Sequence, residues 1–566
     1  MFGTFDLETL GLGGKFINGG VFDGSNYYYF DNLSYLIEHL LSSPCHLYYA
    51  HNSGKYDTRY FISYFLKHGY LLKPLIMKDG SIIRLNVYKK NKKVLELRDS
   101  LSLLRSSLKN LTHSFNVKHK KLELDQDYEK MKITKQQKEY LQYDVLGLYE
   151  VLEEFFKIII TRNVKTALTI SSCAMKDFKI NYPLNYNKIK NIDNKILRSG
   201  YYGGRVEIFK TFFKSSTTDL KCYDVNSLYP YVMSDFKFPT GTYTVSKLPI
   251  TTEYISLVEF DCPKSLNIPL LPIHYKGKLI FSTGYGKGVY SRHELEKALS
   301  LGYKIKYLKT YNFKSSDYLF KDFVSFWYDI KKKSTGSKRT IAKLMLNSLY
   351  GKFGTRSERQ RYIINPDKKW IDKNFKKWSL NDYGNFEIWS NDFSFTMPYV
   401  NIPIVIYVTS LARLTLYKYI EKCNDVYYCD TDSVFTTTKL QTSKDLGAMK
   451  LEKQIKEGYF LRPKVYGLVD AENNQIIKAK GFKKEKINIT AYRKAFNSMN
   501  YKGFSQNNKG IGGIKTTMKR FNSFICSYDQ LKSIKTDYNK REILKNKIDT
   551  KPLFLTKETF KKGYST

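Results

Sequence analysis

Two aspartates stand two residues apart in the segment YYCDTDSVF, residues 427–435, between apolar runs that indicate two strands. Aspartate and threonine are common turn residues, so the segment is compatible with an ordinary hairpin. Alternatively, Asp430 and Asp432 could share one strand face, because residues two apart in a strand point the same way, and together hold a metal ion. The net charge of +41 makes exposed carboxylates here unusual. The rest of the chain has to distinguish the two interpretations.

The composition indicates a folded, multidomain protein with a polyanionic partner. With 42% hydrophobic and 16% aromatic residues, the 566-residue chain cannot be disordered, and its length allows roughly four domains. Lysine and arginine number 94 against 53 acids, which favours nucleic acid as partner because bound phosphates release counterions. A membrane is disfavoured, since the sequence has no apolar run of about 18 residues and no basic amphipathic anchor.

The cysteines and the first residues indicate the compartment. The seven cysteines form no CxxC pair, so neither a zinc ribbon nor a disulfide framework is predicted. The start of the sequence, MFGTFDLETLGLGG, carries acids where a signal or transit peptide requires bases. We therefore expect an intracellular protein without a targeting peptide.

Acids in the first 160 residues suit a two-metal site. FDLET predicts a strand that puts Asp6 and Glu8 on one face. LYYAHNSGKYDTRYFISYFL predicts a strand, a turn and a helix with Asp57 near its start, and ITKQQKEYLQYDVLGLYEVLEEFF predicts a helix with Tyr140 and Asp144 on one face. Singly, each acid could be an ordinary surface residue, or a helix cap for Asp57. Together, the four carboxylates could hold two divalent cations for phosphodiester hydrolysis, with Tyr140 orienting a water.

Two segments resemble parts of a second site. GYYGGRVEIF, residues 200–209, contains consecutive glycines that allow close approach to a phosphate backbone, or simply a turn. KCYDV predicts a buried strand ending at Asp224, followed by a turn and Tyr229. Asp224 could therefore join Asp430 and Asp432 in a cluster at the strand ends.

A basic helix is predicted within KKKSTGSKRTIAKLMLNSLYGKFG, residues 331–354, from Thr340 to Gly351. Lys343, Asn347 and Tyr350 follow at i, i+4 and i+7 and share one helix face. An ammonium group, an amide and a phenol ring on one face suit a nucleoside triphosphate, with the lysine on the phosphates and the tyrosine on the base.

These segments together resemble a known family. DLET, HNSGKYD and YLQYD resemble the three motifs of DEDD-type 3′–5′ proofreading exonucleases. DVNSLYP, KLMLNSLYG and YCDTDS resemble motifs A, B and C of family B DNA polymerases. YYGG, TSLAR at 409–413 and KVY at 464–466 resemble motifs of the protein-primed branch found in phages and linear plasmids. The resemblance spans residue 5 to about residue 482, which favours the metal-site interpretation of the two aspartates.

The resemblance implies two active sites, each with two Mg²⁺ or Mn²⁺ ions. The exonuclease ligands are Asp6, Glu8, Asp57 and Asp144, with Tyr140 also catalytic. The polymerase ligands are Asp224, Val225 and Asp432, with Asp430 in support and Lys343 catalytic. The implied nucleotide-binding residues are Tyr229 (as steric gate against a ribose 2′-hydroxyl), Lys331, Arg339, Lys343, Asn347 and Tyr350. The implied DNA-binding residues are Asn52, Ser100, Leu101, Lys121, Tyr201, Gly203, Gly204, Thr409, Arg413, Lys464, Tyr466 and Lys478.

The implied fold is a multidomain α/β and α+β assembly, in which an RNase H-like exonuclease precedes palm, fingers and thumb with two insertions. The expected divisions are 1–160 exonuclease, 161–195 connection, 196–235 first palm part, 236–319 first insertion (terminal-protein region), 320–354 fingers, 355–397 second insertion (strand displacement and processivity), 398–458 second palm part, and 459–566 palm end and thumb. NNKGIGGIKTTMKR in the last part reads as thumb or DNA clamp.

The implied activity is DNA-directed DNA synthesis with proofreading and strand displacement, on template–primer DNA with dNTPs. A terminal protein would act as primer, no membrane is involved, and a monomer is expected. The protein would act in the cytoplasm of a phage-infected cell, or in an organelle or the cytoplasm of a cell that carries a linear plasmid. Alternatives are extension of an ordinary nucleic-acid primer, an exonuclease with a non-catalytic DNA-binding platform, and a non-enzymatic nucleic-acid-binding protein.

Overall fold

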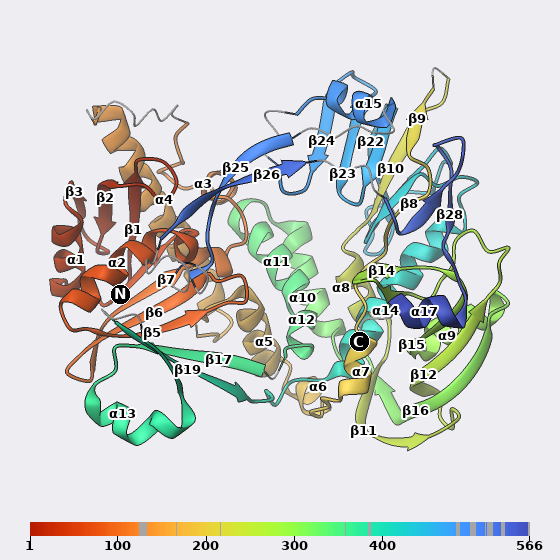
Figure 1. Cartoon of the computed structure of the whole chain (residues 1–566), viewed down its shortest axis with the longest axis horizontal. Helices are drawn as coiled ribbons and strands as arrows, with labels where there is room; N and C mark the ends of the chain where they lie inside the picture. The colour runs from red at the N-terminus through yellow and green to blue at the C-terminus, as the bar shows by residue number, and fades with distance from the viewer. Residues whose placement is uncertain are drawn as a thin grey trace.

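Three large β-sheets organise the computed structural model of the chain (Figure 1). The structure describes residues 1–123, 133–165, 167–215, 217–356, 358–382, 386–482, 487–497, 505–514, 517, 525–533 and 538–563. Among these residues, no helix combines the length and the apolar character needed to cross a membrane.

The N-terminal region contributes seven strands to a ten-stranded sheet in the order β18-β19-β17-β5-β6-β7-β4-β1-β2-β3. The alternation of GTFDLET, predicted from the sequence, is observed in β1: Phe5 and Leu7 are buried against α1 and α2, while Asp6 and Glu8 face the other side, beneath α4. The first seven strands are β1 (Gly3–Thr9), β2 (Phe16–Phe22), β3 (Tyr27–Phe30), β4 (Leu47–Ala50), β5 (Leu71–Ile76), β6 (Ile82–Lys89) and β7 (Lys92–Asp99).

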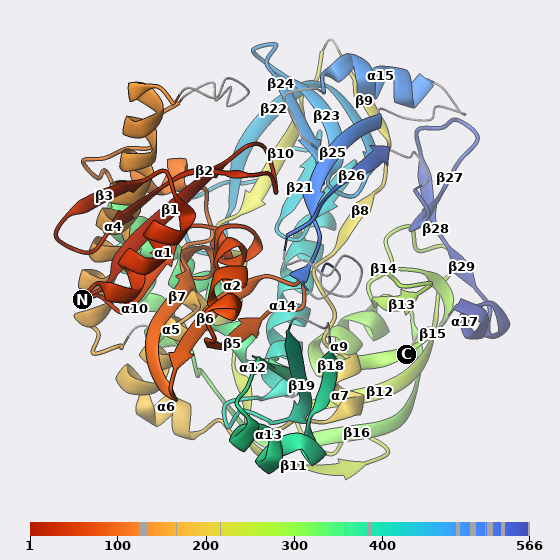
Figure 2. The same ribbon diagram turned by 60° about the vertical axis from the view of Figure 1, so that its left-hand side comes forward.

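Helices cover both faces of this sheet (Figure 2). The long helix α4 begins with a capping box, in which Thr134 and Gln137 satisfy each other's backbone N–H groups. The predicted strand, turn and helix around Asp57 are observed as β4, η1 and α2. The elements are α1 (Leu33–Ser42), η1 (Ser53–Lys55), α2 (Asp57–Lys67), η2 (Ser100–Ser102), α3 (Leu108–Ser114) and α4 (Lys135–Ile160).

A second sheet of eight strands has the order β24-β23-β22-β10-β21-β20-β8, with β9 paired to β22. The predicted strand at KCYDV is β10, and YYCDTDSVF forms the β20–β21 hairpin. Behind the sheet runs α14 (Ile402–Ile420), which is buried along almost its whole length. The strands are β8 (Val206–Ile208), β9 (Phe212–Lys214), β10 (Leu220–Val225), β20 (Tyr428–Asp430), β21 (Ser433–Thr436), β22 (Met449–Arg462), β23 (Val465–Asp470) and β24 (Gln475–Ala479).

A helical group stands between the two sheets (Figure 1). The predicted basic helix begins at Gly336 rather than Thr340, and it bends at Leu349 instead of ending at Gly351. The helical run continues to Phe353, because a single glycine lowers helix propensity without ending a helix. The helices are α5 (Ile170–Asn181), α6 (Pro183–Asn187), α7 (Lys195–Ser199), α8 (Leu228–Asp235), α10 (Lys321–Lys333), α11 (Gly336–Ser348) and α12 (Tyr350–Phe353).

The segment 236–319 builds most of the third sheet, in the order β11-β16-β12-β15-β29. Its last strand, β29, comes from the C-terminal end of the chain and pairs parallel to β15. The elements are β11 (Phe238–Ser246), β12 (Glu253–Cys262), β13 (Ile273–Tyr275), β14 (Lys278–Ile280), β15 (Thr283–Ser291), α9 (Arg292–Ser300), β16 (Lys304–Asp317) and β29 (Phe554–Leu555).

The segment 355–397 extends the N-terminal sheet instead of forming its own. Strand β17 pairs with β5 through Ile364 and Leu72, and β19 and β18 follow outward. The sequence did not predict this continuity between segments so far apart. The elements are β17 (Glu358–Ile364), α13 (Lys368–Asn374), η3 (Phe375–Lys377), β18 (Ser379–Asp382) and β19 (Glu387–Ser394).

The C-terminal hairpin of β25 and β26 reaches from the second sheet towards the N-terminal one (Figure 1). Of the basic segment 507–520, residues 515, 516 and 518–520 lie outside the described part. The elements are α15 (Ile489–Asn497), β25 (Ser505–Ile511), β26 (Ser527–Ser533), β27 (Arg541–Ile543), β28 (Thr550–Pro552) and α17 (Lys557–Gly563).

The buried Arg59 of α2 fastens this hairpin to the N-terminal region. Its guanidinium donates to the Gly512 carbonyl at 2.6 Å and to the Gly80 carbonyl at 3.1 Å. Next to this contact, Ile514 is fully buried within the N-terminal core. The N-terminal region and the C-terminal hairpin are therefore held together by a charged hydrogen-bond donor and an apolar anchor.

Replacing Arg59 with methionine should loosen this attachment, because two buried carbonyls lose a charged donor. We expect a local destabilisation of about 2 kcal/mol, measured as faster hydrogen exchange at residues 510–514. Lys55→Met is the control, since the neighbouring Lys55–Asp79 pair is half-exposed and should contribute little. Unchanged exchange in Arg59→Met would show that Arg59 does not fasten the hairpin.

Candidate active sites

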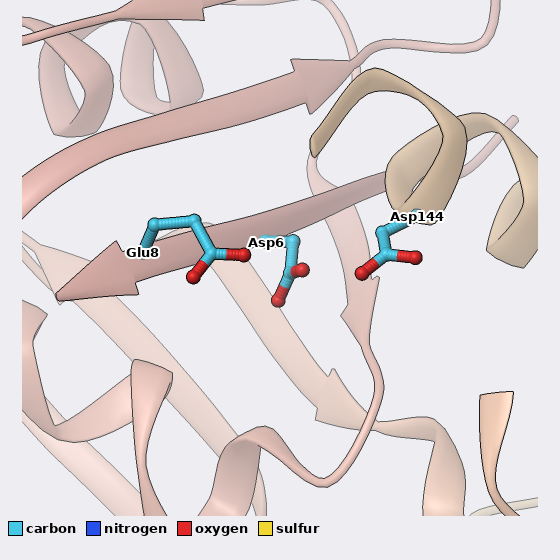
Figure 3. Close-up of side chains that lie close together, drawn as sticks. All are labelled: Asp6, Glu8 and Asp144. Carbon is cyan, nitrogen blue, oxygen red and sulfur yellow. The ribbon is translucent and has the colours of Figure 1, made fainter. Parts of the chain in front are cut away.

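Three of the predicted exonuclease acids meet beneath α4 (Figure 3). Strand β1 supplies Asp6 and Glu8, α4 supplies Asp144, and one carboxylate oxygen of each lies within 4.8 Å of the others. Asp57, the first residue of α2, is buried at 4% exposure and close enough for its charge to affect Asp6. The four acids predicted from three separate motifs therefore form one cluster.

The electrostatics of this cluster suit a divalent cation. Burial, and then repulsion from Asp57, Asp144 and Glu8, raises the pKa of Asp6. Burial also raises the pKa of Asp57 to about 8. The Oδ1 atom of Asp144 is buried and has no hydrogen-bond partner among the described residues. Acids crowded in this way, with an oxygen left unpaired, are a donor set that a hard cation fits.

Lys121 and Tyr140 border the same cluster. The Lys121 ammonium forms an ion pair with Asp144 and lies 4.4 Å from the centre of the Tyr140 ring. Burial, followed by the Asp144 charge, raises the pKa of Tyr140 to about 12, so its hydroxyl stays protonated and can donate. The structure thus places Lys121 at the acids, beside the tyrosine, rather than on a separate DNA-binding surface.

An unpredicted aspartate shapes the loop that carries Asn52. The Asp99 carboxylate accepts from the backbone N–H groups of Asn52 and Leu101 at 2.9 Å and of Gly54 at 3.2 Å. These bonds hold Asn52 in the left-handed conformation, at φ 61°. In the sequence, Asp99 stands before a serine in RDSLSLL, a position that is also typical of a helix cap and therefore did not indicate this role.

Ser100 stays a predicted DNA-binding residue, but its side chain is engaged inside the protein. Ser100 is fully buried, and its hydroxyl donates to the Ala50 carbonyl at 3.2 Å. The same hydroxyl lies 2.9 Å from Nδ1 of His51, another residue that sequence reasoning missed. Asn52 is exposed and Leu101 is partly exposed, and both remain predicted DNA contacts.

The acids of the second site converge at the ends of β10 and the β20–β21 hairpin. Asp224 pairs with Ser433 across the antiparallel ladder, and the Val225 N–H donates to the Asp432 carbonyl at 2.8 Å. Burial, then the charge of Asp432, raises the pKa of Asp224 to about 7. Glu452 on β22, which the sequence did not single out, is the next contributor to that rise.

The predicted shared strand face of Asp430 and Asp432 is wrong. Thr431 has φ 65°, so Thr431 and Asp432 form the turn of the hairpin and only Asp430 ends a strand. The Lys464 ammonium binds both oxygens of Asp430, at 2.6 and 2.8 Å. The segment YYCDTDSVF is thus a hairpin, and its turn also brings Asp432 close to Asp224. A metal site there stays a prediction.

The helical group presents basic residues near these acids. Lys331 donates to the Ser227 hydroxyl at 2.6 Å, and Arg339 donates to the Lys331 carbonyl at 2.6 Å. Burial, then the charges of Arg339 and Lys343, lowers the pKa of Lys331. Lys343 and Asn347 are exposed on α11.

Two of the predicted nucleotide-binding residues form an aromatic pair. The rings of Tyr229 and Tyr350 stack with centroids 4.6 Å apart and planes at 17°. Tyr229 is on α8, directly after the turn that follows Asp224, and Tyr350 begins α12. The pair therefore lies where the predicted motifs A and B meet.

The glycine loop at 203–204 packs against the hairpin turn. A Cβ at Gly204 would lie 2.8 Å from the Thr431 side chain, and the Thr431 N–H donates to the Arg205 carbonyl at 2.7 Å. Glycine is thus required at 204 by protein packing. Gly203 and Tyr201 are exposed on the same loop and stay predicted DNA contacts.

Thr409 and Arg413 stay predicted DNA-binding residues, but their side chains are engaged inside the protein. Both are buried at 3% exposure within α14. Thr409 donates to the Val405 carbonyl at 2.9 Å. Arg413 is paired with buried Glu294 of α9 at 2.8 Å and donates to the carbonyls of Tyr202 and Gly203, at 2.8 and 3.1 Å. Arg413 therefore supports the glycine loop from behind.

The KVY segment lies beside the hairpin. The Lys464 N–H donates to the Tyr428 hydroxyl at 2.9 Å, and the Tyr466 and Tyr428 rings are 5.4 Å apart. Tyr466 pairs with Lys478 between β23 and β24. Lys464, Tyr466 and Lys478 thus lie on or beside β23 and β24, and Lys464 contacts Asp430. Their DNA contacts stay predictions.

Solved structures resemble this fold over most of the chain. The phi29 DNA polymerase complexed with single-stranded DNA matches with a TM-score of 0.76 at 21% identity, covering 94% of this chain and 100% of that one. The same polymerase complexed with primer-template DNA and incoming nucleotide substrates matches with a TM-score of 0.74 at 21% identity, with the same coverage. The predicted multidomain α/β and α+β fold class is confirmed.

Curated relatives agree with this likeness. The probable DNA polymerase of Neurospora intermedia is 28% identical over 520 residues, covering 77% of this chain and 53% of its own. The probable DNA polymerase of Ascobolus immersus is 28% identical over 78% of this chain and 43% of its own, so the chain spans about half the length of these relatives. The DNA polymerase of Bacillus phage phi29 is 27% identical over 78% of this chain and 81% of its own.

The family model described as DNA polymerase type B, organellar and viral, matches residues 40–127 and 118–397, more than half of the chain. Its match includes Asp57, Asp144, Asp224 and the helix with Lys343. This chain therefore belongs to the organellar and viral type B DNA polymerase family.

Proposed function

We propose that this chain is a DNA-directed DNA polymerase with a 3′–5′ proofreading exonuclease. The observation that carries the proposal is the meeting of Asp224 and Asp432, which are brought together by the β10–β21 pairing and the 2.8 Å bond from the Val225 N–H to the Asp432 carbonyl. These acids adjoin the basic helix α11, as nucleotide addition requires carboxylates for metal ions and cations for a triphosphate.

In the polymerase site, Asp224, Val225 and Asp432 would hold two Mg²⁺ or Mn²⁺ ions. Such ions lower the pKa of the attacking hydroxyl and neutralise charge on the phosphates. Lys343, Lys331 and Arg339 then bind the triphosphate. Asp430 holds Lys464 near the hairpin turn, so that the ammonium can contact the primer strand.

Tyr229 and Tyr350 would form the floor under the incoming nucleotide. Their rings are stacked and only partly buried, so the pair could contact the sugar and base. A ribose 2′-hydroxyl would then collide with the Tyr229 ring, which makes this tyrosine the proposed gate against ribonucleotides. Asn347 shares the helix face of Lys343 and completes the nucleotide contacts.

In the exonuclease site, Asp6, Glu8, Asp57 and Asp144 would hold two divalent ions for hydrolysis of a 3′-terminal phosphodiester. Tyr140 orients the attacking water through its protonated hydroxyl, and Lys121 fixes Asp144. Asn52 and Leu101 border the single strand. One chain would thus carry one site for DNA synthesis and a separate site for DNA degradation.

A terminal protein is the proposed primer, and DNA and dNTPs are the other partners. This rests on YYGG, TSLAR and KVY, and on the similarity to phage and fungal polymerases. We assign 236–319 to terminal-protein contact and 355–397 to strand displacement and processivity, with the other domain divisions as predicted above. The protein would act as a monomer inside a phage-infected cell or a plasmid-bearing organelle.

Separate inactivation of the two sites tests the two-site assignment. Asp224→Ala or Asp432→Ala should abolish nucleotide addition while degradation of single-stranded DNA continues. Asp6→Ala combined with Glu8→Ala should have the opposite effect. The assay follows extension and shortening of one labelled primer–template with dNTPs and Mg²⁺. Loss of both activities from either folded variant would contradict the assignment.

Sugar selection tests the role of Tyr229. Tyr229→Val should admit ribonucleotides, because the ring that meets the 2′-hydroxyl is gone, and the ratio of dNTP to rNTP incorporation should fall by at least about tenfold. Tyr350→Val, which alters the other ring of the pair, is the matched control for lost stacking. An unchanged ratio in Tyr229→Val would remove this residue from the gate.

The pH dependence of stability tests the buried state of Asp57. Its pKa of about 8 lies above the unfolded value of about 4, so the folded metal-free protein binds the extra proton and loses stability as pH rises between these values. In chelator, Asp57→Asn should match the parent near pH 4 and be more stable near pH 8, by thermal unfolding. Mg²⁺ should reverse the order at pH 8. A difference independent of pH would contradict this.

A further inference from the structure

A polar side chain without partners lies directly beside the exonuclease acids. In the antiparallel β1–β2 ladder, Asn18 stands opposite Glu8 and Gly20 stands opposite Asp6. Directly opposed residues project from the same face of a sheet, with Cβ atoms about 5 Å apart. Asn18 therefore lies on the face that α4 covers, next to the acid cluster.

The burial of Asn18 is costly. Its side chain is 0% exposed, and neither Oδ1 nor Nδ2 has a hydrogen-bond partner among the described residues. An amide left unsatisfied in the interior destabilises the fold, because it loses the hydrogen bonds that it makes to water in the unfolded chain. An apolar residue of similar size would avoid this cost at the same place, so packing alone does not account for an asparagine here.

Two tyrosines of β3 extend the same arrangement. Tyr29 pairs with Gly20, and Tyr27 pairs with Phe22, so both point to the face that α4 covers. Their hydroxyls are also buried without hydrogen-bond partners in the described part of the chain. Burial raises the pKa of Tyr29, and a polar interaction with the Asn18 side chain opposes that rise. The two groups are therefore close, although they do not meet the distance and angle of an ordinary hydrogen bond.

Gly20 allows the Tyr27 hydroxyl to approach the acids. A Cβ at Gly20 would lie only 2.8 Å from that hydroxyl, so a larger residue would occupy its position. Gly20 is the residue opposite Asp6, and the Tyr27 hydroxyl thus lies over the strand next to that carboxylate. Burial, the Tyr29 hydroxyl and the Asp6 charge all raise the pKa of Tyr27, consistent with this proximity.

Polar side chains placed in this way can hold metal-binding carboxylates in position without contacting the metal ion themselves. Carboxylates that bind a metal ion are themselves held by hydrogen bonds, and loss of these outer partners commonly weakens metal binding 10- to 100-fold. Buried polar groups without direct partners are usually joined by ordered water, which makes about three hydrogen bonds. Asn18, Tyr27 and Tyr29 supply both donors and acceptors at one place.

We propose that Asn18, Tyr27 and Tyr29 form an outer hydrogen-bonding set for a divalent cation at Asp6 and Glu8, connected to these carboxylates through buried water. This inference rests on the proposed exonuclease site and adds residues that its motifs do not contain. The three side chains touch neither the cation nor the DNA, so they are positioning residues. They fix the direction of the carboxylates and hold water at the metal's outer side.

The test measures metal binding and stability in the same variants. Asn18→Leu and Tyr27→Phe are made in the full chain carrying Asp224→Asn and Asp432→Asn, which removes binding at the other site. Mn²⁺ is titrated and its free concentration is followed by electron paramagnetic resonance. Each variant should bind Mn²⁺ about tenfold more weakly than the parent. In chelator, Asn18→Leu should unfold at the same or a higher temperature, because an unsatisfied amide is gone.

Two matched controls separate this role from packing. Asn86 lies on β6 of the same sheet, and its Oδ1 is likewise buried without a partner among the described residues. Tyr28 neighbours Tyr27 on β3 but points to the opposite face, where its ring is 4.2 Å from that of His39. Asn86→Leu and Tyr28→Phe should therefore retain the Mn²⁺ affinity of the parent.

The outcomes are distinguishable. Parental affinity in both Asn18→Leu and Tyr27→Phe would overturn the proposal, and so would equal weakening in the two controls. Tyr27→Phe removes a single oxygen, which keeps the test valid if Asn18→Leu folds poorly. If Asp6→Ala with Glu8→Ala removes no bound Mn²⁺ from the parent, the exonuclease metal site itself is wrong. Weakening confined to Asn18→Leu and Tyr27→Phe supports the outer set.

Discussion

The antiparallel pairing of β10 with β21 is the constraint on which the polymerase half depends. It sets Asp224 opposite Ser433, one residue from Asp432. In the sequence, the two aspartates are separated by the segments that build most of the third sheet and by strands β17–β19. Strand side chains alternate, so a slip of one residue would turn Asp224 into the opposite face. The buried neighbours Cys222, paired with Phe435, and Tyr223, paired with Val434, hold that register by packing.

Buried contacts of α14 support the position of the β20–β21 hairpin. Buried Arg413 joins Glu294 of the third sheet's helix to the glycine loop, and the loop in turn packs on Thr431 in the hairpin turn. A buried ion pair contributes little net stability, but breaking one leaves an uncompensated charge. The segment 236–319 is therefore connected to the β20–β21 hairpin through a few buried contacts, and Arg413 of the TSLAR motif supplies the central one.

The sequence predicted local elements and chemistry better than it predicted spatial roles. Strand alternation and helix spacing correctly placed Asp6, Glu8 and Asp144 together, and the family resemblance is confirmed by the family model. The shared face of Asp430 and Asp432 failed because a left-handed residue at Thr431 has no signal in a non-glycine position. The burial of Ser100, Thr409 and Arg413 could not be predicted, because a motif does not indicate which of its side chains are buried. Asp99, Glu294 and Asn18 were missed because their roles come from partners far away in the sequence or across a sheet.

The docking of Ile514 into the N-terminal core has a consequence for the order of folding during synthesis. The core that surrounds Phe5 and Phe61 includes this residue, and Arg59 requires the Gly512 carbonyl as a partner. On the ribosome, the first region of the chain lacks both until residue 514 has emerged from the exit tunnel. Completion of the N-terminal core therefore follows translation of the segments that build most of the other two large sheets, and a nascent chain shorter than 514 residues lacks these contacts.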